Sequence, residues 1–240
     1  MLIANPFPAT MRRPLPPPGM TVYALSDIHG CVDLLAAALD EIEAHHLTHP
    51  AADRLHVFLG DYIDRGPDSR RVIQMLIEWG ARHRSVFLKG NHEGLLLDLL
   101  NHRRWIDYWP QLGGLQTLKS YGIHAPFNPG PDSQPALVDA LIEAMPQAHR
   151  RFLDDLQSFF IFGDFYFTHA GVRPGVPLTE QNDRDLMWIR GEFLNCRDDF
   201  GKYIVHGHTP VLHIDVQPNR INIDTGAYGT GNLTVLALHR

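Results

Sequence analysis

Cysteine is scarce in this chain, as are long apolar stretches and clusters of positive charge. The 240 residues include only Cys31 and Cys196, which are too few for a disulfide framework and lack the CxxC spacing of a zinc or redox site. We therefore expect a reducing, cytoplasmic location. The net charge is −6, and Lys and Arg are not grouped. This argues against nucleic acid as a partner, because such binding needs clustered cations.

The first 20 residues also lack an apolar run long enough for a signal peptide or a membrane span, since prolines interrupt them. We expect no export and no membrane partner. Residues 1–20 are predicted to form a flexible, proline-rich tail, with a ligand for a proline-reading protein as the alternative. Residues 21–240 are predicted to form a single catalytic domain and a monomer.

Apolar residues make up 44% of the chain and charged residues 20%, which is typical of a globular protein. In the first half, β-rich runs alternate with segments of helical periodicity, which indicates βαβ units and a largely parallel sheet. The predicted strands are 21–26, 55–59 and 85–88, and the predicted helices are 32–44 and 69–79. The fold class is therefore α/β.

The second half has a different pattern. Residues 92–156 are mostly helical, and we expect the part from 103 to 155 to cover the sheet, with a substrate groove at its rim. Strands are then predicted at 158–168, 203–205, 212–216, 221–223 and 233–238. These runs imply a second sheet, so two stacked sheets flanked by helices fit the sequence best.

Five short motifs share one context, a strand followed by a loop that carries Asp, Asn or His. They are S-D-I-H-G from Ser26, G-D-Y-I-D-R-G from Gly60, G-N-H-E from Gly90, T-H-A-G from Thr168 and H-G-H-T-P from His206. Ligands of α/β sheets bind beyond the carboxyl ends of the strands, so these motifs are predicted to converge on one site.

The first two motifs favour a cation. Asp27 and His29 are two residues apart in extended chain, so both can hold one ion, although Asp and Gly after a strand are equally typical of a turn with a helix N-cap. Asp61 is predicted to bridge two ions, Asp64 to orient a neighbouring group, and Arg65 to hold phosphate. An exposed, ion-paired loop is the alternative for this motif.

The remaining motifs add nitrogen and amide ligands. The carbonyl of Asn91 can complete a metal shell, and the adjacent His92 can act in acid–base chemistry. His169 and His208 follow two further strands, although a single histidine is more often structural. His206 stands two residues from His208, and spacing alone leaves either as the ligand.

In this order the five motifs resemble the phosphoprotein phosphatase family of binuclear metallophosphoesterases, in particular its compact bacterial and phage serine/threonine phosphatases. The resemblance extends from about Val22 to Leu238 and includes W-I-R from Trp188 and I-D-T-G-A from Ile223. It implies a calcineurin-like metallophosphoesterase fold, in which two stacked mixed β-sheets are flanked by helices in an αββα sandwich.

The resemblance also implies the roles of individual residues. One metal would be held by Asp27, His29 and Asp61, and the other by Asp61, Asn91, His169 and His208. His92, paired with Asp64, would be the proton donor, and Arg65, Arg190 and Asn91 would contact the substrate, while His206 would not bind metal. The ions are expected to be manganese, with iron, zinc, cobalt and nickel as alternatives.

Two such ions would supply a bridging hydroxide that attacks phosphorus directly. The resemblance implies a protein phosphatase acting on phosphoserine or phosphothreonine, with phosphotyrosine as a further substrate, so the expected partner is a phosphoprotein or phosphopeptide. Symmetrical diadenosine tetraphosphate hydrolases share the same motifs and provide the alternative activity. A non-catalytic, metal-dependent binding module is the third hypothesis, and it would require a missing ligand or acid–base group.

Overall fold

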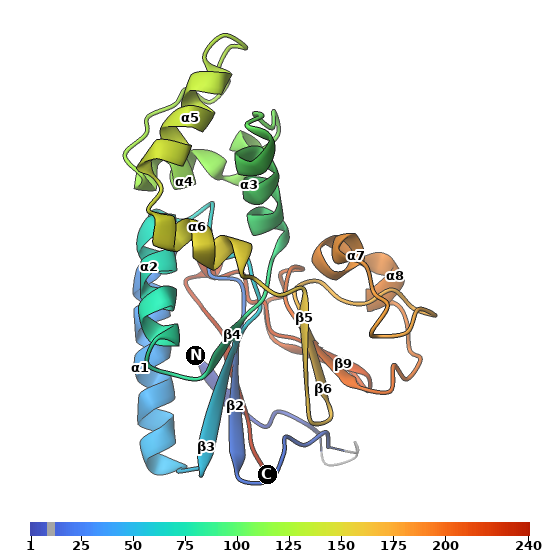
Figure 1. Cartoon of the computed structure of the whole chain (residues 1–240). Helices are drawn as coiled ribbons and strands as arrows, with labels where there is room; N and C mark the ends of the chain where they lie inside the picture. The colour runs from blue at the N-terminus through green and yellow to red at the C-terminus, as the bar shows by residue number, and fades with distance from the viewer. Residues whose placement is uncertain (9–12) are drawn as a thin grey trace.

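Two five-stranded sheets form the centre of the computed structural model, which describes residues 1–8 and 13–240 (Figure 1). The first sheet has the order β1-β10-β2-β3-β4 and the second has the order β5-β6-β7-β9-β8. The first comprises β1 Leu2–Ala4, β10 Val235–Leu238, β2 Met20–Leu25, β3 Asp53–Phe58 and β4 Ser85–Phe87. The second comprises β5 Phe159–Phe162, β6 Phe165–Thr168, β7 Tyr203–His206, β9 Arg220–Asn222 and β8 Asp215–Val216.

The register of the parallel strands brings their carboxyl ends to one edge. Strand β2 pairs with β3 so that Leu25 lies opposite Phe58, and β3 pairs with β4 so that Phe58 lies opposite Phe87. In the second sheet β6 runs parallel to β7, with Phe167 opposite Val205. The loops that follow these strands therefore begin side by side.

Alternating side chains of each strand pack against two different layers. In β2, Tyr23 and Leu25 join the cluster under the helices, whereas Val22 and Ala24 pack against the second sheet. In the second sheet, Ile204 joins an outer cluster with residues of the short helices α7 Asp183–Trp188 and α8 Gly191–Leu194. The arrangement is the predicted αββα sandwich, and the mixed sheets within it are confirmed.

Helices cover both outer faces (Figure 1). On the first sheet these are α1 Val32–Thr48 and α2 Ser69–Gly80. A helical segment follows β4 and comprises α3 Asn91–His102, η1 Pro110–Leu112, α4 Gly114–Ser120, α5 Gln134–Ala144 and α6 Gln147–Asp154. Three short helices complete the fold, α7 Asp183–Trp188, α8 Gly191–Leu194 and α9 Ala227–Thr230. In the described part of the chain, none of the helices is long and apolar enough to cross a lipid bilayer.

Three expectations need correction. The run 233–238 is a strand, but β10 lies in the first sheet, antiparallel to β2, and not in the second. Within the predicted tail, Leu2–Ala4 pairs with β10 as an edge strand, because its small apolar run can add to an open sheet edge; residues 9–12 of that tail lie outside the described residues. Of the run 212–216, only Asp215–Val216 is a strand.

Candidate metal centre

The predicted site residues meet where the two sheets present their carboxyl edges. The first sheet contributes loops after β2 and β3 and the start of α3 after β4, and the second contributes the loops after β6 and β7. The buried residues brought together in this way are Asp27, His29, Asp61, Asn91, His92, His169 and His208. All of these except the fully buried His169 line a cavity of about 290 Å³.

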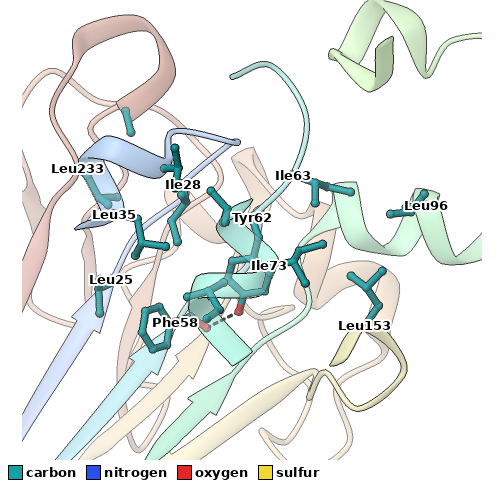
Figure 2. Packing of buried hydrophobic residues seen from close by; sticks show 14 of the residues in the cluster. Leu25, Ile28, Leu35, Phe58, Tyr62, Ile63, Ile73, Leu96, Leu153 and Leu233 are labelled. Atoms are coloured by element: carbon teal, nitrogen blue, oxygen red, sulfur yellow. Dashed lines mark hydrogen bonds between the residues drawn. The ribbon is translucent and has the colours of Figure 1, made fainter. Parts of the chain in front are cut away.

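Apolar residues between the polar ones anchor these loops. Ile28 separates Asp27 from His29, and its side chain points into the core beside Leu35 and Leu233 (Figure 2). Tyr62 follows Asp61 and donates its hydroxyl proton to the backbone oxygens of Phe58 and Leu88. The hydrophobic effect thus fixes one side of each loop and leaves the polar side chains facing the cavity.

Two groups of possible metal ligands share Asp61. In the first, ligand atoms of Asp61, His169 and His208 all lie within 4.8 Å of one another, and in the second the same holds for His29, Asp61 and His92. A carboxylate common to both groups is placed to bridge two ions. Asn91 adjoins the first group, since its Oδ1 lies 3.0 Å from His169 Nε2.

The rings of His29 and His169 are oriented so that the Nε2 atom of each faces a carboxylate oxygen of Asp61. His169 Nδ1 lies 3.0 Å from the backbone oxygen of Leu59, and His29 Nδ1 lies 2.9 Å from that of Ile63. A neutral ring that donates through Nδ1 to these backbone oxygens has an unprotonated Nε2. The Nε2 atom lies 3.4 Å from Asp61 Oδ2 in His169 and 3.5 Å from it in His29. Acceptors facing acceptors in a buried site require a cation between them, as in metal sites whose histidines donate to backbone carbonyls.

The pKa values favour the same conclusion. Burial lowers the pKa of His29 to about 3 and that of His208 to about 2, so both rings are neutral and able to bind metal at physiological pH. Burial, together with the charges of Asp224 and Asp61, raises the pKa of Asp27. Divalent ions would relieve this repulsion, so the donor set fits a binuclear centre.

Asp27 reaches the site by a different contact. Its carboxylate accepts the backbone N–H of His208 at 3.1 and 3.2 Å, which ties the loop after β2 to the loop after β7. Gly207 permits this approach, because a Cβ at that position would collide with Asp27 Oδ1. The contact joins the two sheets at the metal centre.

Backbone strain is concentrated here. Among the described residues, seven other than glycine have positive φ, and five belong to the site motifs. These five are His29, Asp61, Asp64, Arg65 and His208. Such conformations cost about 1–3 kcal/mol each and persist where surrounding structure enforces them, commonly at functional sites.

Glu93, which the motif analysis gave no role, provides part of that enforcement. Its fully buried carboxylate accepts the backbone N–H groups of Asp61, Tyr62 and Gly90 at 2.8, 2.8 and 3.0 Å. A further bond, from the N–H of Ile63, is 3.3 Å long. Glu93 therefore holds the loop that carries Asp61 in position.

His92 is oriented by Asp64, the partner that the family resemblance implies. His92 Nδ1 lies 2.7 Å from Asp64 Oδ2, which also accepts the indole N–H of Trp109 at 3.0 Å, while Asp64 Oδ1 accepts the hydroxyl of Thr117 at 2.5 Å. Trp109 and Thr117 come from the segment expected only to cover the sheet, so this segment also builds the site. No spacing in the sequence marks these two residues.

Two arginines and two further residues complete the rim. Arg65 and Arg190 both line the cavity, and the guanidinium of Arg65 lies 4.6 Å above the ring of Tyr228. Arg190 Nε is 3.2 Å from His208 Nε2. Asp224, from the I-D-T-G-A motif, lines the cavity with its pKa raised to about 6, mainly by burial.

His206 lies away from both ligand groups. Its ring is fully buried against Phe193, and its Nδ1 is 3.1 Å from the backbone oxygen of Gly207. Burial and the nearby Arg220 lower its pKa to about 3. The geometry thus brings His208, and not His206, to the metal groups.

Comparison with known proteins identifies the family to which this geometry corresponds. The model of the calcineurin-like phosphoesterase family matches residues 20–232, which is most of the chain. A solved cold-active protein-tyrosine phosphatase of the psychrophile Shewanella superimposes with a TM-score of 0.56 at 16% identity, covering 94% of this chain and 78% of that chain. This likeness concerns the fold alone.

Curated relatives match over similar lengths. The bis(5'-nucleosyl)-tetraphosphatase PrpE [asymmetrical] of Anoxybacillus flavithermus is 28% identical over 232 residues, covering 88% of each chain. That of Halalkalibacterium halodurans is 24% identical over 231 residues, covering 88% of this chain and 87% of its own. The serine/threonine-protein phosphatase 1 of Salmonella typhimurium is 29% identical over 220 residues, covering 89% and 90%.

Proposed function

Because the chain belongs to the calcineurin-like phosphoesterase family, a class of metal-dependent hydrolases with binuclear centres, we propose that it hydrolyses dinucleoside polyphosphates such as diadenosine tetraphosphate. The observation that carries this proposal is the match, over 88% of the chain, to relatives named as bis(5'-nucleosyl)-tetraphosphatases. It reverses the order of the sequence-based hypotheses, which placed phosphoproteins first.

The metal ligands follow from the two groups around Asp61. Asp27 and His29 would complete one ion's shell, and Asn91, His169 and His208 would complete the other's. When bound, such ions would supply hydroxide as the nucleophile near neutral pH. Manganese is the proposed ion, since carboxylate, amide and imidazole donors suit it, although they also suit other first-row metals.

The protein's own side chains position the substrate and move the proton. Arg65 and Arg190 would hold the non-bridging oxygens of the attacked phosphate with their planar guanidinium groups. As the new P–O bond forms and the bond to the leaving group breaks, His92 would give its proton to the leaving oxygen, while Asp64 keeps the ring oriented. The complete set of ligands and acid–base groups argues against a non-catalytic binding module.

Product analysis tests the proposal. Manganese-loaded protein is incubated separately with diadenosine tetraphosphate and with a phosphoserine peptide, and the products are separated by chromatography. We expect a much higher kcat/KM for the dinucleotide. ATP with AMP would indicate asymmetrical cleavage and two molecules of ADP symmetrical cleavage. Asp61→Asn is the control, because loss of the shared ligand should abolish both activities.

A protein phosphatase is the second candidate, favoured by the match to the Salmonella typhimurium serine/threonine-protein phosphatase 1 over 89% of the chain. The same metal centre and proton donor would serve a phosphomonoester. Faster release of phosphate from the peptide than cleavage of the dinucleotide would support this candidate and contradict the first.

A further inference from the structure

A second cavity adjoins the metal centre. Its volume is about 540 Å³, and it is lined by residues of the segment 182–192 together with Arg173. It shares two lining residues, Trp188 and Arg190, with the cavity that contains the metal ligands. A volume of this size lies within the range of small-molecule sites, about 300–1,000 Å³.

Trp188 stands in the wall between the two cavities. It is the last residue of α7, and 39% of its surface remains exposed. Its ring meets that of the metal ligand His208 edge to face, with centroids 6.1 Å apart and an interplanar angle of 79°. A large, exposed aromatic surface next to a phosphate site is suited to stacking on a nucleobase, which every base permits through its flat face.

The arginines that line the second cavity differ in their ion pairs with carboxylates. Arg173 donates to both oxygens of Asp185 at 2.6 and 2.7 Å and to Glu192 at 2.5 Å, so its charge is balanced within the wall. In the part of the chain that the structure describes, no carboxylate forms an ion pair with Arg184. Arg184 precedes Trp188 by four residues in α7, so both lie on the same face of the helix.

We propose that this second cavity binds the part of a dinucleoside polyphosphate that extends beyond the metal centre. Trp188 stacks on its base, and Arg184, with Arg190 at the boundary, holds the phosphates between the base and the metals. The inference rests on the proposed dinucleotide activity. A polyphosphate continues beyond the attacked group with negative charge on each further phosphate, which Arg184 can contact, whereas a phosphoserine carries a single phosphate.

The test compares two substrates of different length. Diadenosine tetraphosphate reaches both cavities, whereas p-nitrophenyl phosphate is short enough to use the metal centre alone. We expect Trp188→Ala to lower the ratio of kcat/KM for the dinucleotide to kcat/KM for the aryl phosphate about 5- to 150-fold, the equivalent of one lost base–aromatic stack. Trp188→Phe should restore most of that ratio, and Arg184→Ala should lower it about two- to fivefold.

Phe127→Ala is the matched control, because Phe127 is an exposed aromatic residue that lines neither cavity, and its ratio should equal that of the wild type. If wild-type protein cleaves the dinucleotide but Trp188→Ala lowers both activities equally, the subsite is wrong while the proposed function stands. If wild-type protein cleaves only the aryl phosphate, both proposals fail. A phosphoserine peptide that is more sensitive to Trp188→Ala than the dinucleotide would also overturn the subsite.

Discussion

Replacing His92 by asparagine should lower kcat about 10²- to 10⁴-fold while changing KM little, because the substitution removes a proton donor from an otherwise intact site. The His92 ring is buried, with Nδ1 2.7 Å from Asp64 and Nε2 3.8 Å from Asp61. Burial alone would lower its pKa, but the charge of Asp61 and the hydrogen bond that the ring donates to Asp64 outweigh this and raise the pKa to about 9. In the metal-free protein the ring therefore holds a proton at pH 7.

The expected loss corresponds to about 3–5 kcal/mol of transition-state stabilisation. It should depend on the leaving group, since a stable phenolate needs no proton whereas a basic one does. We therefore expect His92→Asn to lose more rate on phenyl phosphate than on p-nitrophenyl phosphate. Asp64→Asn, which keeps the shape but removes the charge that orients the ring, should show a smaller loss in the same direction.

Steady-state kinetics on both aryl phosphates provide the measurement, with bound metal quantified in each variant. Unchanged metal content is required, because His92 also lies within one of the two ligand groups. A raised KM at unchanged kcat would refute the role of His92 in proton transfer. The same conclusion would follow from an equal loss on both substrates.

Three further predictions concern the support of the site. Gly207→Ala should reduce bound metal measured by mass spectrometry, because its Cβ collides with Asp27, whereas Gly130→Ala, with open space around it, should retain full metal. Glu93→Gln replaces one acceptor oxygen by an NH2 donor that faces backbone N–H donors, and should cost about 3 kcal/mol in urea unfolding; an unchanged midpoint would contradict the role of Glu93 in holding the loop. Burial lowers the pKa of His56 to about 4, so the unfolded chain takes up a proton first as pH falls below about 6.5 and stability decreases. In metal-free protein, His56→Phe should reduce the loss of stability between pH 7 and pH 5 by about 2 kcal/mol, and an identical loss in both proteins would exclude this histidine.

The sequence predicts the parts of the fold that depend on local pattern. The strands that carry the motifs, β2, β3 and β7, were located within one or two residues, because each is a short apolar run followed by a polar loop. The partner of β10 could not be predicted in this way. Its apolar run is compatible with either sheet, and only the packing of the whole chain selects the position between β1 and β2.

In the candidate site, too, local sequence pattern predicted some residues, whereas others depend on the packing of the whole chain. Polar residues directly after strands were found because the carboxyl ends of parallel strands coincide. Trp109 and Thr117 were missed, since they reach Asp64 from a helical segment whose position over the site has no local signature. Glu93 stood within a recognised motif, but its function, acceptance of the backbone N–H groups of Asp61, Tyr62 and Ile63, depends on long-range contacts.

The position of β10 has a consequence for the protein during its synthesis. Translation delivers β2, β3 and β4 early, yet the sheet whose loops carry the candidate metal ligands lacks an inner strand until Val235–Leu238 has left the ribosome. His208, from the other sheet, emerges only shortly before. A chain that ends before Val235 therefore leaves an edge of β2 exposed, and one that ends before His208 also lacks a candidate metal ligand, so hydrolytic activity should arise only after Val235–Leu238 has been made.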